Sequence, residues 1–347
     1  MDRAPGKSDD QVVKEALGQS GDRPEEYITD WYLPERDPLA GFFYPGPMEI
    51  RRFPSIYDMA SGLLERSIAK TRDGYEEFVV RAGNVSYRGH KIDSVDGYIY
   101  TLRRMPTMIP RLEQLGMPSP IQSIMMDSHL NRGGLLLVCG ETGNGKSTTC
   151  ASVVKDRMLK HGSFCLTVED PPEMPLHGIH GKGRCIQTEV RSGNFAEAMR
   201  GAMRCYPSVN GSMLYVGETR DSETAAEVLT IATNGHLVLT TIHAQDVQSA
   251  LHRFLILAKA RTSEEDARNA MGSVFRLALH QRLEAQSSGS QSGKKKLKLQ
   301  FLISQDRTSP VASRIRKGEI DALASDIQQQ KMVLDAQGMD GLKNLWR

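Results

Sequence analysis

The sequence is poor in cysteine and has almost no net charge. Its five cysteines are scattered without paired spacing, which excludes a cysteine-based metal site, and we expect them to be small buried side chains in a reducing compartment. The 44 basic and 42 acidic residues leave a formal net charge of +2, which demands neither nucleic acid nor an anionic membrane as a partner. No apolar run approaches the ~20 residues that span a bilayer, and the polar start MDRAPGKSDDQ is not a signal peptide. These absences predict a soluble, cytoplasmic protein.

What is present is enough chain for two domains and a tail, at 347 residues. Residues 1–30 are polar and are expected to be flexible. Residues 27–54 mix aromatic side chains with prolines, which predicts either an irregular strap on a folded surface or a docking segment for another chain.

The pattern over 55–92 predicts a helix followed by strands. Apolar residues recur at helical spacing over 55–74, with Ser55 as the expected cap, and residues 76–92 alternate in the manner of strands. A small α+β domain over 31–105 follows from this pattern. Turns are expected at Gly83-Asn84 and at Arg88-Gly89.

Strands and helices alternate after a proline-rich linker over 106–118. Apolar runs over 134–139, 164–169, 212–218 and 236–243 are separated by helical patterns, which predicts a doubly wound, mainly parallel sheet in a domain over 119–330. The stretch SEEDARNAMGSVFRLALHQRL (263–283) is expected to be helical, residues 285–293 to form a flexible turn, and residues 331–347 to form a polar helical tail. KKKLKLQFLIS (294–304) predicts a strand whose basic run is either a nucleic-acid patch or a protected sheet edge.

The stretch GETGNGKS carries the strongest chemical signal, because it fits the phosphate-loop pattern of a glycine, four free residues and then Gly-Lys-Ser. Glycines let backbone amides turn toward phosphates, the Lys146 ammonium reaches the outer phosphates, and the Ser147 hydroxyl reaches a magnesium ion. Cys139 adjoins the loop, so its alkylation is expected to remove activity. The expected nucleotide-binding residues are Gly140, Glu141, Thr142, Gly143, Asn144, Gly145, Lys146, Ser147 and Thr148.

Acidic and imidazole side chains follow three of the expected strands. Glu218 comes after MLYVG, at the strand end where ligands bind in such sheets, and is assigned as the base or water-orienting residue. Of Glu169 and Asp170, one is expected to hold magnesium or its bound water and the other to brace the loop, although the pair is equally typical of a turn. His243 is expected either to sense the terminal phosphate or to hydrogen-bond Glu218.

Four segments together resemble the Walker A, Asp box, Walker B and His box of the secretion and traffic ATPases. They are GETGNGKSTT, VEDPPEMPLHG, LYVGETRD and NGHLVLTTIHA, in that order. The resemblance covers roughly residues 55–330. It implies a PAS-like N-terminal domain, a RecA-like P-loop ATPase domain, ATP and Mg²⁺ as cofactors with Ser147, Glu169 and Glu218 at the metal, and a homohexamer that serves membrane-embedded machinery.

Within this family the sequence is most similar to the DotB and TraJ type, which serves type IVB secretion and conjugative transfer. PilT proteins carry an AIRNLIRE-like motif for pilus retraction, whereas this chain has VASRIRKGE at 311–319. The resemblance also implies arginines that act on phosphates across a domain or subunit boundary. The candidates are Arg103, Arg191, Arg200, Arg204 and Arg220, with Arg103 and Arg204 preferred.

The expected function is a hexameric, Mg²⁺-dependent ATP hydrolase at the cytoplasmic face of the inner membrane, which powers type IVB secretion or conjugation by domain movement. Catalysis is assigned to Glu218, Lys146, Glu169, His243, Arg103 and Arg204. The alternatives are a PilT-like pilus motor, a DNA-translocating ATPase and a nucleotide-dependent adaptor without turnover. No direct nucleic-acid binding is expected, because no basic, aromatic-lined stripe is evident.

Overall fold

The computed structural model describes residue 15 and residues 27–83, 85–190, 193–207, 211–285 and 295–346. The chain divides into two compact units, Met1–Met108 with Pro171–Pro175, and Ile109–Asp170 with Leu176–Arg347. Apart from Ala285, the expected turn over 285–293 lies outside the described residues, as does most of the expected flexible start. Among the described helices, none is both long and apolar enough to cross a bilayer.

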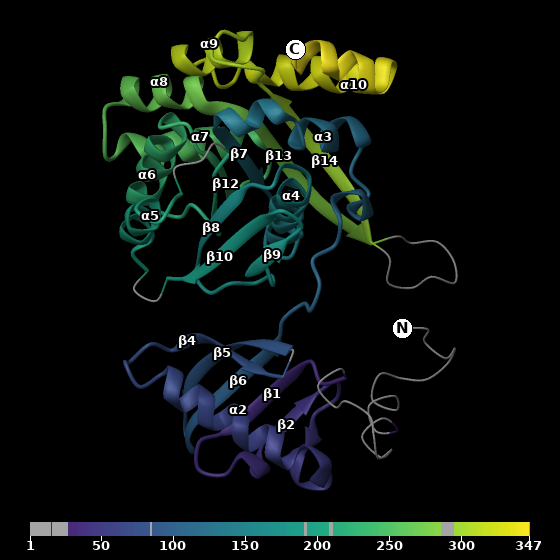
Figure 1. Ribbon diagram of the computed structural model, residues 1–347, viewed down its shortest axis with the longest axis vertical. Helices are drawn as coiled ribbons and strands as arrows, with labels where there is room; N and C mark the ends of the chain where they lie inside the picture. Colours follow the sequence, from purple (N-terminus) through teal and green to yellow (C-terminus); the bar gives the residue numbers. More distant parts are fainter. Residues whose placement is uncertain are drawn as a thin grey trace. The chain divides into compact units, whose positions relative to one another are not determined.

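The first unit is a six-stranded antiparallel sheet with helix α2 (Tyr57–Lys70) packed against it (Figure 1). The buried side of α2, including Leu63, shares one core with Trp31 and Phe43 from the sheet. The strand order is β3-β2-β1-β6-β5-β4. The strands are β1 (Asp30–Pro34), β2 (Phe42–Tyr44), β3 (Met48–Glu49), β4 (Glu77–Ala82), β5 (Val85–Ser94) and β6 (Gly97–Arg104).

The segment rich in aromatic residues and proline, 27–54, forms β1, β2 and β3 of this sheet, so the prediction of an irregular strap was wrong, while the alternative of a docking segment for another chain stays a prediction. Its side chains alternate across the sheet, as strand geometry requires. Trp31 and Phe43 point into the core, while Tyr32 and Phe42 stack at 4.5 Å between ring centroids. The prolines do not interrupt the strands, because Pro34 is the last residue of β1.

Two local predictions in this unit were also wrong. Gly89 lies in the middle of β5, opposite Phe78, and does not form a turn with Arg88. A Cβ at Gly89 would collide with the Phe78 ring, so packing and not chain reversal requires glycine there. Ser55 lies inside a 3-10 turn (Pro54–Ile56), and α2 begins after Ile56 without a side-chain cap.

The second unit contains an eight-stranded, mainly parallel sheet in the order β14-β13-β7-β12-β11-β8-β10-β9. Only the edge strands β14 and β9 pair in the antiparallel sense. This is the doubly wound α/β architecture that the alternating pattern predicted. The strands are β7 (Gly134–Cys139), β8 (Phe164–Glu169), β9 (Gly178–His180), β10 (Gly183–Glu189), β11 (Met213–Val216), β12 (Leu237–Ile242), β13 (Phe275–Ala285) and β14 (Lys295–Ile303).

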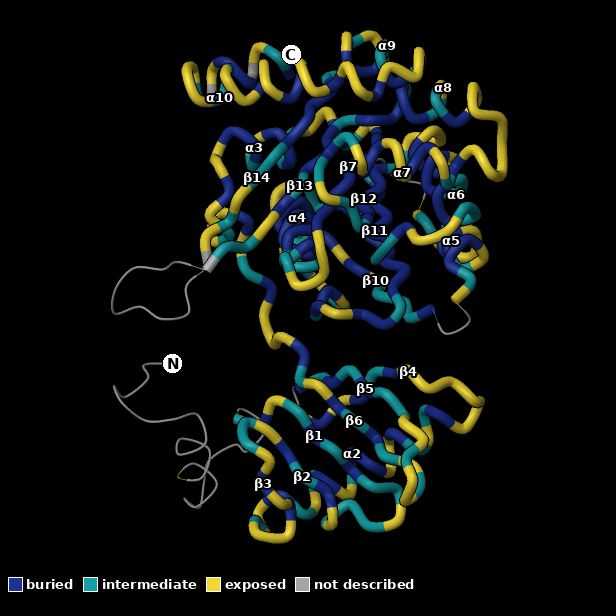
Figure 2. Tube along the Cα trace, turned by 180° about the vertical axis from the view of Figure 1, so that it is seen from behind, coloured by how far each residue is buried: buried dark blue, intermediate teal, exposed yellow. Residues whose placement is uncertain are grey.

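Helices cover both faces of the sheet, and the central strands are buried throughout (Figure 2). Leu135 and Leu137 of β7 share one core with α5 to α8, while the alternate residues Leu136 and Val138 face the opposite side, where α4 packs. The helices are α3 (Ser119–Met125), α4 (Lys146–His161), α5 (Phe195–Met203), α6 (Ser222–Thr233), α7 (Val247–Lys259), α8 (Glu264–Val274), α9 (Pro310–Lys317) and α10 (Leu323–Trp346).

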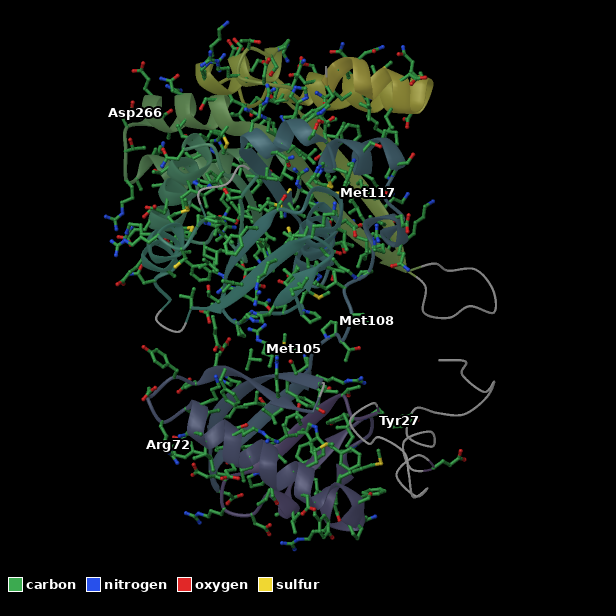
Figure 3. All side chains as sticks on the ribbon, in the orientation of Figure 1. Tyr27, Arg72, Met105, Met108, Met117 and Asp266 are labelled. Carbon is green, nitrogen blue, oxygen red and sulfur yellow. The ribbon has the colours of Figure 1, made fainter. Side chains whose placement is uncertain are left out.

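The stretch 263–283 is only half helical, which corrects the prediction. Ser263 caps α8, and Asp266 lies in the first turn at the surface of this unit (Figure 3). The chain then becomes β13, which pairs in parallel with β7 and in the antiparallel sense with β14. A strand buried between two others carries apolar residues on both faces, so its periodicity alone does not distinguish it from a helix.

The basic segment at 294–304 forms the strand β14, as predicted, at one edge of the sheet. Helix α10 covers part of this edge. The Gln330 side chain accepts a hydrogen bond from the Ile303 N–H at 2.8 Å and donates one to the Ile303 carbonyl at 2.9 Å. Lys296 and Lys298 are exposed, which is typical of a protected edge strand.

Candidate active site

The phosphate-loop sequence lies between the end of β7 and the start of α4. Gly140, Gly143 and Gly145 adopt positive φ values of 147°, 78° and 79°, which side-chain-bearing residues rarely adopt. Glu141 and Thr142 are exposed at the loop, while Ser147 and Thr148 are half-buried in the first turn of α4. The loop therefore opens onto a helix N-terminus, which favours anionic oxygens.

Lys146 lies along this loop and is 8% exposed. Its Nζ donates hydrogen bonds to the carbonyl oxygens of Gly140 and Glu141, both at 2.9 Å. The ammonium is thus held beside the loop by acceptors that phosphate oxygens can replace.

Glu218 is held from two sides where the chain leaves β11. Its Oε2 accepts from Arg220 Nε at 2.8 Å, and its Oε1 lies 3.3 Å from His243 Nε2. Of the two arrangements expected for His243, the structure contains the contact with Glu218. Arg253 in turn donates to the His243 carbonyl at 3.1 Å, which fixes the chain after β12.

Glu169 ends β8 and is 2% exposed. Gln187 Nε2, from the neighbouring strand β10, donates to Glu169 Oε1 at 2.8 Å. Burial raises the pKa of the Cys150 thiol on α4, the charge of Glu169 raises it further, and Lys146 opposes the change. The charged groups of Glu169 and Lys146 therefore both lie close to Cys150, near the start of α4.

The parallel register explains why these groups meet. β8, β11, β12 and β7 are consecutive neighbours in the sheet, so their carboxyl ends lie at one edge. Each strand ends at one of these groups: Glu169 is the last residue of β8, Glu218 follows β11, His243 follows β12, and the phosphate loop follows β7. This edge is the position at which doubly wound sheets bind ligands.

The two preferred arginines lie elsewhere. Arg103 is in the first unit, on β6, and pairs with Asp30 at 2.7 Å, a contact that raises the pKa of Arg103. Arg204 follows α5, near Tyr206, whose hydroxyl donates to Met213 at the amino end of β11. Arg204 is therefore at the opposite edge of its own sheet from the phosphate loop.

The other arginine candidates are distributed differently. Arg220 contacts Glu218, as described above, and Arg200 lies 3.4 Å from Glu227. Arg191 lies outside the described residues.

The cysteine environment corrects one expectation. Cys139 is fully buried, and burial, reinforced by the Asp246 charge and opposed by Lys146, raises the pKa of its thiol to about 12. A buried, protonated thiol is not a target for alkylation. Cys205, in contrast, is exposed.

Sequence reasoning missed three residues that hold the site together. Gln187 binds Glu169, Arg253 binds the chain at His243, and Gln281 of β13 binds the phosphate loop. Gln281 lies in the stretch expected to be helical, which placed it far from the loop. The pairing of β13 with β7 brings Gln281 beside the loop, and no local sequence pattern encodes that pairing.

A family model described as "Type II/IV secretion system protein" matches residues 70–332. The chain belongs to this family. With its phosphate loop formed between β7 and α4, it is a P-loop ATP hydrolase of the secretion and pilus ATPase kind. The resemblance found in the four motifs is thereby confirmed.

Individual relatives agree with this assignment. The chain is 32% identical to the uncharacterized protein YggR of Escherichia coli K12, over 87% of this chain and 86% of YggR. It is 33% identical to the type IV pilus retractation ATPase PilT of Pseudomonas aeruginosa, but that match spans only 53% of each chain.

Two solved structures share the fold. The pilus retraction motor PilT with bound ADP superposes with a TM-score of 0.69 at 24% identity, covering 96% of both chains. The Legionella pneumophila ATPase DotB gives 0.68 at 20% identity, covering 96% of this chain and 94% of DotB. At such identities these structures support the architecture and not the cellular role.

Proposed function

We propose that the chain is a Mg²⁺-dependent motor ATPase that forms a homohexamer and powers a type IVB secretion or conjugative transfer machine. It would act at the cytoplasmic face of the inner membrane, bound to membrane-embedded components. The observation that carries the proposal is that Lys146, Glu169, Glu218 and His243 lie at one edge of the sheet, in a chain of the Type II/IV secretion system protein family.

In the proposed reaction, Glu218 orients a water for in-line attack on the terminal phosphoryl group. His243 and Arg220 hold the two oxygens of this carboxylate, so its orientation is set before the nucleotide arrives. The Lys146 ammonium moves from the loop carbonyls to the outer phosphates and stabilises the charge that develops there.

The donor set suits magnesium. Ser147 offers a hydroxyl, and Glu169 and Glu218 offer carboxylates, which are the hard oxygen ligands that Mg²⁺ prefers alongside phosphates and water. Among the described residues, no group of three or more His, Cys, Asp or Glu side chains could hold a metal ion. In the proposed site, nucleotide phosphates and water would be ligands beside the side chains of Ser147, Glu169 and Glu218. The bound ion would neutralise phosphate charge during transfer.

The mechanical output in this proposal is movement of the N-terminal domain on the linker 106–118. Arg103 and Arg204 would contact phosphates across a domain or subunit boundary, and loss of the terminal phosphate would release them. Arginine suits this task because it stays charged and binds phosphate oxygens in a bidentate manner.

Two substitutions test the proposal. Lys146→Ala should abolish ATP binding or hydrolysis, while Glu218→Gln should bind ATP and hydrolyse it at least about 100-fold more slowly. The surface carboxylate Glu264 of α8 gives a matched control, because Glu264→Gln should hydrolyse ATP at the wild-type rate. Wild-type turnover in Glu218→Gln would exclude Glu218 as the water-orienting residue.

A pilus motor of the PilT kind is the second candidate, supported by the 33% identity to the type IV pilus retractation ATPase PilT of Pseudomonas aeruginosa. The stretch 311–319 reads VASRIRKGE where PilT proteins carry an AIRNLIRE-like motif, which speaks against retraction; within it, the half-exposed Arg314 pairs with Asp326 at 2.5 Å and donates to the Ala322 carbonyl. Loss of twitching in a host carrying Lys146→Ala, with secretion and conjugation intact, would favour the pilus motor.

The remaining candidates have different signatures. A DNA-translocating ATPase should bind DNA in a salt-dependent manner and hydrolyse ATP faster when DNA is added. A non-motor adaptor should support transport with Glu218→Gln, which the motor proposal forbids.

A further inference from the structure

Strand β13 lies directly beside the phosphate loop and contacts it at two points. The parallel pairing of β13 with β7 runs as far as His280 opposite Cys139, so Gln281 reaches the position where β7 turns into the loop. A Cβ at Gly140 would collide with the Gln281 carbonyl oxygen. The start of the loop is thus packed against the β13 backbone.

The second point is Asn144, the residue between the two left-handed glycines Gly143 and Gly145. Gln281 Nε2 donates to the Asn144 carbonyl at 2.5 Å, and the Leu283 N–H donates to Asn144 Oδ1 at 2.9 Å. Both groups of one loop residue, backbone and side chain, are therefore bound by the same strand.

The orientation of the Gln281 amide follows from its surroundings. Its side chain is 1% exposed, and in the part of the chain that the structure describes Oε1 has no hydrogen-bond partner. The opposite orientation would place Oε1 against the Asn144 carbonyl oxygen, and two acceptors repel each other. The donated bond to Asn144 is the contact that fixes this buried amide.

These contacts determine which way the loop presents its polar groups. A carbonyl tied to β13 cannot turn toward a phosphate, where its oxygen would repel the anionic oxygens. The loop is also rich in glycine, so its backbone has many alternative conformations unless outside contacts restrict them. A loop that is already held loses less conformational entropy when the nucleotide binds.

We infer that Asn144 and Gln281 are positioning residues that hold the phosphate loop in its nucleotide-binding conformation before ATP arrives. The inference rests on the ATPase activity of this chain and not on the machine that it serves. The Asn144 backbone remains part of the phosphate loop, but the two side chains are directed to contacts between the loop and β13, so their removal should affect nucleotide affinity and leave the chemical step unchanged.

The test uses the full-length chain with two single substitutions and their combination. Gln281→Met keeps the side-chain volume but removes the donor, and Asn144→Ala removes the side-chain acceptor at a half-buried position without opening a core cavity. Arg282→Ala is the matched control, since Arg282 lies between Gln281 and Leu283 on the same strand and is exposed.

The expected result is a split between affinity and turnover. Each single variant should weaken binding of the fluorescent probe mant-ATP and raise KM about five- to thirtyfold, as expected for the loss of one hydrogen bond, with kcat within about twofold of the wild type. The double variant should bind mant-ATP about as tightly as the single variant with the lower affinity, because both substitutions disrupt the same set of contacts and their effects should not add. Arg282→Ala should match the wild type.

Hydrogen exchange without nucleotide separates this inference from the ATPase assignment. Amides 140–145 should exchange faster in both single variants, while those of β12 keep their protection, and thermal midpoints report whether each variant folds. Unchanged exchange in the loop, or a fall in kcat at constant KM, would overturn the inference. If the wild-type chain failed to bind mant-ATP, the ATPase assignment would fail, and the exchange experiment would still decide whether β13 holds the loop.

Discussion

At the scale of single residues, Glu218 depends on its neighbours for its orientation. A carboxylate that must point at one water gains from being held at both oxygens, and Arg220 and His243 hold one each. Arg220 contacts one carboxylate oxygen from a residue two positions along the chain, whereas His243 connects the other oxygen to the strand end of β12. The two contacts therefore have separable effects.

His243→Ala should lower kcat about 10- to 100-fold and change KM little, because supporting contacts of this kind affect the reacting group and not substrate binding. Steady-state kinetics would measure both constants. The surface residue His252 on α7 gives the control, and His252→Ala should behave as the wild type. A rise in KM at constant kcat would instead assign His243 to phosphate binding.

The cysteines provide a prediction about chemical modification. At pH 8 a thiol with a pKa of about 12 is ionised in only about one molecule in 10,000, so Cys139 should not react with N-ethylmaleimide. The thiolate forms only as the pH rises toward that pKa, where Cys139 is still buried. Peptide mapping should find label on the exposed Cys205 first, with ATP hydrolysis retained. Early label on Cys139 would show that β7 opens readily.

The residues that could be predicted from the sequence differ from those that could not in how far apart their contacts lie along the chain. Lys146 and the loop glycines lie in one short motif, and Glu218 follows a recognisable buried strand, so local pattern located them. Gln187 and Gln281 meet partners 18 and 137 residues away. Such contacts are set by strand register, which no local pattern contains.

At the scale of elements, helix α4 connects the phosphate loop to the start of the second unit. Near its C-terminal end, Lys155 Nζ donates to the Ile109 carbonyl at 2.6 Å. Asp156 accepts from the Leu112 N–H at 2.8 Å and pairs with Arg111 at 2.6 Å. The helix that begins with Lys146 thus holds residues 109–112, directly after the boundary between the units.

Removing these contacts should loosen that segment selectively. In Lys155→Ala/Asp156→Ala, amides 109–115 should exchange roughly thirtyfold faster, which corresponds to about 2 kcal/mol of lost local stability, because a buried N–H loses its acceptor. Mass spectrometry would follow the exchange, with the surface variant Lys182→Ala as control. The KM for ATP should stay at the wild-type value, since the phosphate loop lies at the other end of α4. Unchanged exchange would mean that other contacts hold this segment.

The element predictions were correct where a helical or strand pattern stood alone and wrong where two patterns overlapped. Strands β7, β8, β11 and β12 and helices α4 to α7 were predicted because each has one period and clear ends, whereas β9 and β10 lie in a stretch that was expected to be a loop and were missed. β13 was taken for a helix because a strand with neighbours on both sides is apolar on both faces, and β1 was missed because its short alternating pattern lies in a segment with several prolines. The error at β13 concerns its neighbours in the sheet, which the chain order does not reveal.

At the scale of the whole molecule, the position of Arg204 constrains how a catalytic arginine could act. Within its own unit it lies near the amino ends of the strands, whereas the phosphate loop lies at their carboxyl ends. Arg204 therefore cannot serve the nucleotide of its own subunit without unfolding α5. If it acts on a phosphate at all, the phosphate belongs to another subunit of the proposed ring.

Mixing two inactive variants tests this directly. Lys146→Ala removes the loop lysine, Arg204→Ala removes the candidate arginine, and each alone should hydrolyse ATP poorly. In rings assembled from an equal mixture, one site in about four should combine an intact Lys146 with an intact Arg204 from its neighbour, if subunits assemble at random. Hydrolysis should then recover to about a quarter of the wild-type rate, at unchanged ring mass. If Arg204 acted within its own subunit, every mixed ring would stay inactive, because no subunit would carry both side chains. Wild-type hydrolysis by Arg204→Ala alone would exclude Arg204 as a catalytic arginine, and Arg103 and Arg200 would remain as candidates.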